Sequence, residues 1–137
     1  AAIGIQQLKK LKKFLNVRKK NAEYFKKLFK KSNFYIQEEL GQSSWFAFSL
    51  IIKEKHKNKI SLLKKLFKKL NVEYRPIISG DFTKKSAINF MKHKIFINSK
   101  NAHYVDKYGI MFANHHYDIK SKLLKLKNEI DKIINDK

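Results

Sequence analysis

The fold is decided by the stretch Ser44-Trp45-Phe46-Ala47-Phe48-Ser49-Leu50-Ile51-Ile52-Lys53, which contains two of the longest apolar runs in the chain. Bulky side chains fall on both faces of a strand here, a pattern typical of a buried central strand. Residues 38–44 are mostly polar and include Gly41, which indicates a loop before this strand. The apolar runs are far too short to span a bilayer. We therefore expect a soluble intracellular domain with residues 45–53 at the centre of its sheet.

A long helix is predicted ahead of this strand. In residues 1–31, apolar side chains such as Ile5, Leu8 and Leu11 recur at steps of three, four or seven, with lysines on the opposite face. At roughly 1.5 Å per residue the helix would be about 45 Å long, more than a small domain needs. Such a helix connects domains or packs along a partner, and the alternative is a core helix with a frayed basic end.

The rest of the chain alternates between helical and extended patterns. Apolar side chains recur at the helical period in residues 57–71, 101–108 and 119–134. Strand-like runs occur at residues 34–37, 72–78 and 110–113, and Pro76 places the second of them at a sheet edge or a strand end. This order predicts an α+β fold, a small antiparallel or mixed sheet covered by helices on one face.

The length of 137 residues suits one domain with a protruding helix. We divide the chain into a connecting helix, residues 1–31, and a small domain, residues 32–137. The sequence begins at Ala1 without a methionine, so we expect a fragment of a longer protein.

The formal charge of +21 invites a nucleic-acid interpretation, but its make-up argues against one. Only Arg18 and Arg75 are arginines among the 32 basic residues, whereas nucleic-acid interfaces depend on the bidentate arginine fork. Lysine, isoleucine and asparagine are all abundant and all have A/T-rich codons, so a skewed genome explains the surface. The alternative function is a stand-alone lysine-rich module that binds nucleic acid or an anionic membrane, and steep weakening with salt would identify it.

Several kinds of chemistry are excluded by motif. Without cysteine there is no disulfide, thiolate metal cluster or cysteine nucleophile. No GxSxG, GxGxxG or GxxxxGK[ST] pattern occurs. A zinc site needs three or four converging ligands, and the adjacent pair His115-His116 does not supply them, so we expect no metal. By motif alone the chain is not a self-sufficient enzyme.

Arg75 is the strongest candidate for a binding residue. A guanidinium among so many lysines points to bidentate binding of a carboxylate or phosphate, and the alternative is a structural ion pair with a nearby acid. The loop around His115 and His116 either contacts a polar ligand or carries simple surface histidines. His56, His93 and His103 are interpreted as isolated, solvent-facing histidines. Paired carboxylates are scarce, and Asp81, Asp106 and Asp118 are interpreted as lone carboxylates.

Four stretches, in order and together spanning nearly the whole chain, resemble one family, the DegT/DnrJ/EryC1/StrS enzymes. The first resembles the helix that leaves the family's large domain, and the second its first small-domain strand. The last two resemble the "RPI..GNF" and "NADYID..G...GNHH" segments of the 3-dehydratase branch. The stretches are Ala1-Ala2-Ile3-Gly4-Ile5-Gln6-Gln7-Leu8 with residues 18–24, Ser44-Trp45-Phe46-Ala47-Phe48, Val72-Glu73-Tyr74-Arg75-Pro76-Ile77 with Gly80-Asp81-Phe82, and residues 101–106 with Gly109 and Asn114-His115-His116.

The resemblance implies the C-terminal part of a longer enzyme of type I aminotransferase fold, a cytoplasmic homodimer that pairs through the missing part. The implied enzyme is a 4-keto-6-deoxysugar 3-dehydratase or an aminotransferase of lipopolysaccharide and O-antigen sugar biosynthesis, and both reactions stay open. Pyridoxal phosphate or pyridoxamine phosphate would be held mainly by the missing N-terminal domain. That domain would also supply the lysine or histidine that anchors the cofactor, since no lysine here matches the motif.

The resemblance also implies which residues bind the nucleotide-sugar substrate. In this family the small domain closes the substrate cleft, which fits Arg75, Asn114, His115 and His116 as phosphate or sugar contacts. No residue of the fragment is expected to be catalytic. Asp81 stands where the branch usually has asparagine, and a carboxylate there would repel a diphosphate, so that position is not carried over as a ligand.

Overall fold

Strand β2 (Ala47–Ile52) lies inside a four-stranded antiparallel sheet in the computed structural model, which describes residues 1–95 and 100–136. The strand order is β1-β2-β4-β3, where β1 is Phe34–Ile36, β4 is Gly109–Ala113 and β3 is Tyr74–Arg75. Strand β2 pairs antiparallel with β1 on one side and with β4 on the other. The predicted central position of this strand is confirmed.

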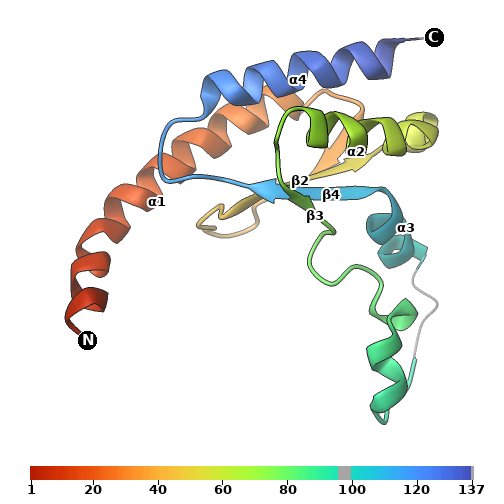
Figure 1. Cartoon of the computed structure of the whole chain (residues 1–137), viewed down its shortest axis with the longest axis horizontal. Helices are drawn as coiled ribbons and strands as arrows, with labels where there is room; N and C mark the ends of the chain where they lie inside the picture. The colour runs from red at the N-terminus through yellow and green to blue at the C-terminus, as the bar shows by residue number, and fades with distance from the viewer. Residues whose placement is uncertain (96–99, 137) are drawn as a thin grey trace.

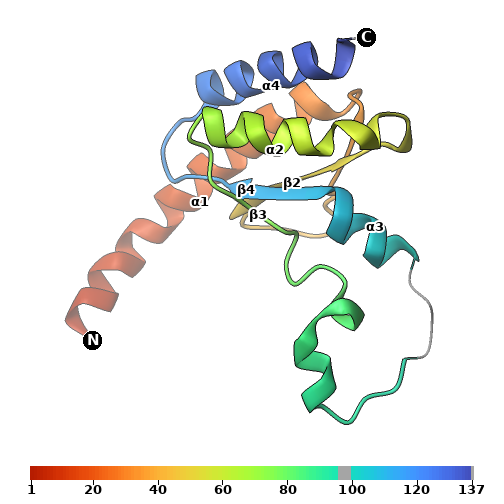
Figure 2. The same cartoon turned by 45° about the vertical axis from the view of Figure 1, so that its right-hand side comes forward.

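Three helices cover one face of the sheet, as Figures 1 and 2 show: α1 (Ala2–Phe29), α2 (Ile60–Lys69) and α4 (Lys120–Asn135). A fourth helix, α3 (Lys100–Tyr108), leads directly into β4 at one end of the sheet. The part of the chain that the structure describes also contains three short 3-10 helices: η1 (Glu54–Lys59), η2 (Phe82–Lys84) and η3 (Ser86–Phe90). The predicted α+β class, with helices on one face of a small sheet, is confirmed. Within the described residues, none of the helices has the length and apolarity that crossing a membrane requires.

The core lies between the sheet and these three helices. Alternate side chains of β2, including Phe48 and Leu50, point into it and are fully buried. The ring of Phe25 from α1 stacks on Phe48 with the ring centroids 4.4 Å apart. The second half of α1 therefore belongs to the core, while its first half extends away from the sheet with Ile3 and Leu8 exposed (Figure 1). The division of the chain at residue 31 stays a prediction.

Two details of the sheet differ from the sequence-based expectation. The second face of β2 is only half-buried at Ser49 and Ile51, because none of the helices in residues 1–95 and 100–136 forms a layer on that side. Strand β3 contains two residues where residues 72–78 were expected, although its position at the sheet edge is as predicted. It ends before Pro76, which has no N–H to donate, and the backbone then turns at Ile78 with a φ of 54°.

Lys59 ties the start of α2 to the end of α4. Its Nζ donates to the carbonyl oxygens of Ile133 at 2.8 Å and of Ile134 at 3.3 Å. The last carbonyls of a helix lack intrahelical partners and carry partial negative charge, so a cation at this place stabilises the helix end.

Candidate functional site

The uncovered face of the sheet presents Arg75 at its edge. Pairing sets Arg75 opposite Met111 and Met111 opposite Ser49, so the three side chains form a row across β3, β4 and β2. A hollow of about 210 Å³ opens beside this row. It is lined by Phe46, Ala47, Glu73, Arg75, Met111, Phe112 and Ala113.

Arg75 forms an ion pair with Glu73, two residues earlier in the chain. Its Nη2 and Nε donate to Oε1 of Glu73 at 2.8 and 3.1 Å. The ion pair that the sequence left as an alternative is thus present, and the binding role of Arg75 stays a prediction. Both side chains are about three-quarters exposed, so water screens the pair and it stabilises the fold little. An anion with two oxygens could therefore compete with Glu73 for the guanidinium fork.

Asn114 lies under the loop that follows β4 rather than on its surface. Its side chain is only 3% exposed, and Nδ2 donates to the carbonyl oxygens of Arg18 at 2.9 Å and Trp45 at 2.8 Å. Its Oδ1 accepts from Nδ2 of the equally buried Asn21 on α1 at 3.1 Å. Both donors of the amide and one acceptor site are thus engaged within the protein, and Asn114 fixes the loop against α1 and β2.

The two histidines of this loop face different neighbours. The His115 ring stacks on Tyr117 with centroids 4.7 Å apart, whereas the His116 ring packs on Phe14 of α1 at 4.5 Å. Burial lowers the pKa of the His115 imidazole below its ordinary value of 6.5, and the positive charge of Lys122 acts in the same direction. At neutral pH the His115 ring is therefore uncharged and offers one N–H donor and one acceptor nitrogen.

His115 also lines a cavity of about 590 Å³ at the edge of the sheet, together with Tyr117, Lys122 and Lys125. This cavity and the hollow beside Arg75 share three lining residues: Glu73, Phe112 and Ala113. The structure thus brings Arg75 and His115 to adjoining depressions at one end of β3 and β4. His116 points to α1 instead, so the four predicted contact residues do not converge on one point.

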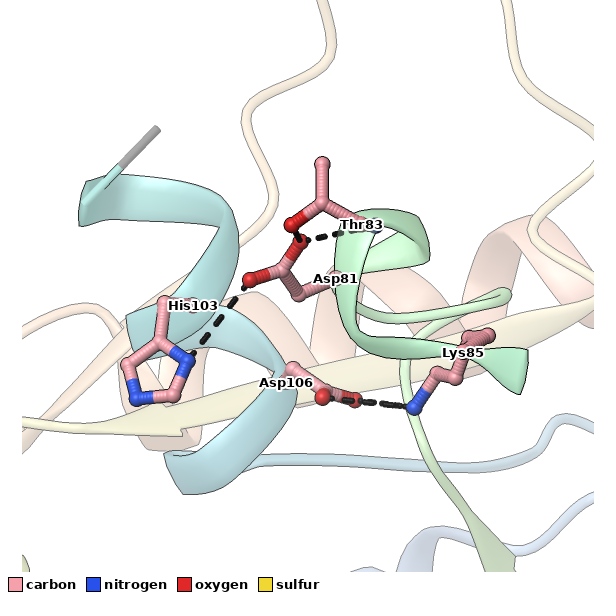
Figure 3. A network of polar contacts seen from close by, with 5 residues as sticks. All are labelled: Asp81, Thr83, Lys85, His103 and Asp106. Atoms are coloured by element: carbon pink, nitrogen blue, oxygen red, sulfur yellow. Dashed lines mark hydrogen bonds and ion pairs between the residues drawn. The ribbon is translucent and has the colours of Figure 1, made fainter. Parts of the chain in front are cut away.

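A polar network joins the turn after β3 to helix α3 (Figure 3). The carboxylate of Asp81 accepts from the backbone N–H of Thr83 at 3.1 Å and from its hydroxyl at 2.6 Å. Nδ1 of His103 lies 3.6 Å from the other oxygen of Asp81, and Lys85 donates to Asp106 at 3.2 Å. The Thr83 hydroxyl is the main cause that lowers the pKa of Asp81 below its ordinary value of 3.8.

The interpretation of His103 as isolated is therefore wrong, whereas Asp81 and Asp106 each face a basic side chain rather than a second carboxylate. The aspartates and their partners are 21 or 22 positions apart, and no helical or strand period relates them. One local signal was available in the sequence, because Asp81 and Thr83 have the spacing with which an aspartate caps a short turn.

The lysines at the candidate site do not fit the anchor of a pyridoxal phosphate cofactor. A lysine that forms an imine with a carbonyl cofactor is activated by burial or by a second cation. Lys122 and Lys125, the lysines that line the larger cavity, are both exposed. Within residues 1–95 and 100–136, no group of three histidine or carboxylate side chains could hold a metal ion.

Comparison with known proteins shows where similar sequences and this fold recur. Residues 1–102 match the sequence profile of the DegT/DnrJ/EryC1/StrS aminotransferase family. The chain is 42% identical over 134 residues to a GDP-4-keto-6-deoxy-D-mannose 3-dehydratase of Yersinia pseudotuberculosis. That match covers 96% of this chain and 34% of the dehydratase, so the chain spans about a third of the length of this curated relative.

Solved structures give the same picture. The E. coli GDP-4-keto-6-deoxy-D-mannose-3-dehydratase with bound hydrated PLP superposes with a TM-score of 0.87 at 37% identity, covering 97% of this chain and 34% of that one. A variant of GDP-4-keto-6-deoxymannose-3-dehydratase with bound GDP-perosamine superposes with a TM-score of 0.87 at 39% identity, covering 93% and 33%. Both similarities extend over almost all of the elements described above.

Proposed function

The chain belongs to the DegT/DnrJ/EryC1/StrS aminotransferase family, and from this premise we propose that it forms the C-terminal third of a PLP-dependent enzyme that acts on a nucleotide sugar. One observation carries the proposal: almost the whole chain matches a dehydratase at 42% identity while covering a third of it. The reaction that this match favours is 3-dehydration of a 4-keto-6-deoxysugar in lipopolysaccharide or O-antigen biosynthesis. We further propose that the enzyme is a cytoplasmic homodimer.

In this proposal the rest of the enzyme holds the cofactor, because the two lysines that line the cavity beside His115 do not fit its anchor. Bound PLP or pyridoxamine phosphate would supply an electron sink at the substrate carbon. This chain would contribute the wall that closes over the substrate and excludes water from the cleft. Its charge of +21 would draw an anionic nucleotide sugar toward that wall.

Arg75 is proposed to bind the diphosphate of the substrate. Its guanidinium fork matches two phosphate oxygens. Glu73 holds the fork on the uncovered face of the sheet, and bonds to a diphosphate would replace the two hydrogen bonds to Glu73. His115 and His116 are proposed as contacts to the nucleotide or sugar, with His115 neutral and able to accept or donate. Asn114 is proposed to support the same site, because its buried amide holds the loop that carries His115 and His116 in place.

A chimera tests the proposal without knowledge of the remaining two thirds. Residues 1–137 would replace the matching third of the Yersinia pseudotuberculosis dehydratase, and turnover of GDP-4-keto-6-deoxymannose would be measured. We expect an active enzyme that keeps the absorbance band of bound cofactor. A chimera that folds and binds cofactor but releases no product would contradict the proposal.

A matched pair of variants in the chimera tests the role of Arg75. Arg75→Lys keeps the charge but removes the bidentate fork, so we expect KM for the nucleotide sugar to rise about tenfold with kcat little changed. Lys55→Arg serves as the control, because it exchanges the same two cations at an exposed position on η1 that lines neither depression. Equal effects of the two variants would count against a specific role for Arg75.

A further inference from the structure

The segment that follows Arg75, residues 76–81, packs closely on α3 and β4. The Ile77 side chain fills the space beside Gly109, where an added Cβ would lie 2.7 Å from Cδ1 of Ile77. Three residues after Ile77, Gly80 packs so closely on Asp106 of α3 that an added Cβ would overlap its carboxylate. The turn is closed by a hydrogen bond of 3.0 Å from the N–H of Gly80 to the carbonyl of Ile77.

Ile78 is strained in this arrangement. Its φ of 54° lies in the left-handed region, which is unfavourable for a β-branched residue. Its side chain is 81% exposed, so no burial of its own compensates for that strain. A strained residue of this kind persists only when the segments on both sides of it are fixed.

Strand β3, which precedes Ile78, cannot hold the strained residue in place by itself. Strand β3 has two residues, of which Arg75 pairs only with Met111 of β4, and so short an edge strand is not stable by itself. The other side of Ile78 is the turn at Gly80 and Asp81. The anchor that resists the strain therefore lies in the contacts of that turn with α3, together with the packing of Ile77 on Gly109 of β4.

Asp81 is the buried member of these contacts. Its side chain is 6% exposed, and it bonds to Thr83 on its own side and faces His103 on α3 (Figure 3). The second bridge, between Lys85 and Asp106, is partly exposed on both sides and is more strongly screened by water. The charge of Lys84 also favours the ionised form of Asp81.

We propose that Asp81 is a positioning residue, which docks the strained turn on α3 and thereby fixes Arg75 on the uncovered face of the sheet. The docked turn holds Ile77 against Gly109, and Pro76 makes the link from Ile77 back to Arg75 stiff. Removing the Asp81 carboxylate releases the strain at Ile78, frees Ile77 and lets the guanidinium of Arg75 reorient. The importance of this for substrate binding rests on the proposed function of Arg75.

The orientation of Arg75 is measurable in the 137-residue chain itself. Arg18 and Arg75 are its only arginines, so a proton–nitrogen NMR spectrum holds two Nε–H signals, and Arg75→Lys assigns them. We expect Asp81→Ala to shift the Arg75 signal while the Arg18 signal stays in place. Asp81→Asn keeps an acceptor for Thr83, so it should shift the Arg75 signal less.

Cleavage by a lysine-specific protease measures the docking of the turn in parallel. Asp81→Ala should speed cleavage after Lys84 and Lys85 about tenfold, since a buried cap is lost. Cleavage within α2 should be unchanged. Asp118→Ala is the matched control, because Asp118 is also a loop aspartate that accepts from the backbone N–H two residues ahead.

Two further variants keep the proposal testable even where Asp81→Ala fails to fold. Ile78→Asn relieves the strain, because asparagine tolerates a positive φ, and should slow cleavage while leaving the Arg75 signal in place. His103→Ala changes an exposed side chain and should act in the same direction as Asp81→Ala, but more weakly. The opposite directions in which these two variants change the cleavage rate distinguish loss of the Asp81 contact from a general loss of stability.

The proposal is overturned by either of two results. In the first, Asp81→Ala changes neither cleavage nor the Arg75 signal, which means that Asp81 anchors nothing. In the second, cleavage accelerates while the Arg75 signal stays in place, which means that docking does not reach Arg75. Both measurements are made without substrate, so an inactive chimera with these shifts present would refute the proposed function alone.

Discussion

Replacing the buried amide of Asn114 tests the internal scaffold of the candidate site most directly. In Asn114→Ala three hydrogen bonds disappear, to Arg18, Trp45 and Asn21, of which the last two partners are buried and the first is half-buried. At about 1 kcal/mol for each bond, we expect the free energy of unfolding to fall by about 3 kcal/mol. With a urea dependence of about 2 kcal/mol per molar, the midpoint of unfolding should fall by about 1.5 M.

Urea titration followed by tryptophan fluorescence measures this change. Trp45 is the only tryptophan and is buried beside Asn114, so its emission reports the region in question. Asn114→Asp separates hydrogen bonding from packing. It keeps the shape of the side chain, but it replaces the NH2 group, which donates two hydrogen bonds, with an oxygen that faces the same two carbonyl oxygens and can only accept. At neutral pH it should destabilise at least as much as alanine does. An aspartate variant as stable as the parent, or a loss below about 1 kcal/mol for alanine, would refute the reasoning. The exposed Asn128→Ala on α4 is the control and should change stability by less than about 0.5 kcal/mol.

Three other predictions concern the core, a helix end and the response to acid. Phe25→Ala removes a fully buried ring that stacks on Phe48 and should lower the free energy of unfolding by about 3–5 kcal/mol in the same titration. Lys59→Met leaves the last carbonyls of α4 without their cation and should cost about 1–2 kcal/mol, and an unchanged melting temperature would contradict that role. Because the pKa of Asp81 is lowered in the folded protein, its contribution to stability is present above about pH 3.8 and is lost as the pH falls through the folded value. Melting temperatures of Asp81→Asn should therefore differ from those of the parent at neutral pH and converge with them in strong acid.

Much of the fold was predictable because its signals are local. The apolar period of residues 1–31 matches α1, and the run around Phe48 matches β2 at the centre of the sheet. Such periods act over a few neighbouring residues and need no knowledge of distant segments. The extent of β3 was overestimated for the same reason, since residues 72–78 are extended in pattern but only two of them find a partner strand.

The candidate site was predictable in part. Arg75 stood out by its chemistry, and the structure places it on the uncovered sheet face near His115. The contacts of Asn114 could not be derived from the sequence, because its partner Asn21 lies 93 positions away. Whether an asparagine on a loop points outward or inward depends on which helix passes beneath it.

The sequence by itself determined the order of helices and strands, the central strand and the family to which the chain belongs, because each is written in patterns of neighbouring residues. Only the tertiary structure decided that Asp81 faces His103 and that the amide of Asn114 makes its hydrogen bonds within the protein. The physical reason is that a buried polar group must find its partner wherever the fold brings one within hydrogen-bond or ion-pair distance. That partner is set by the packing of distant segments, which no local period encodes.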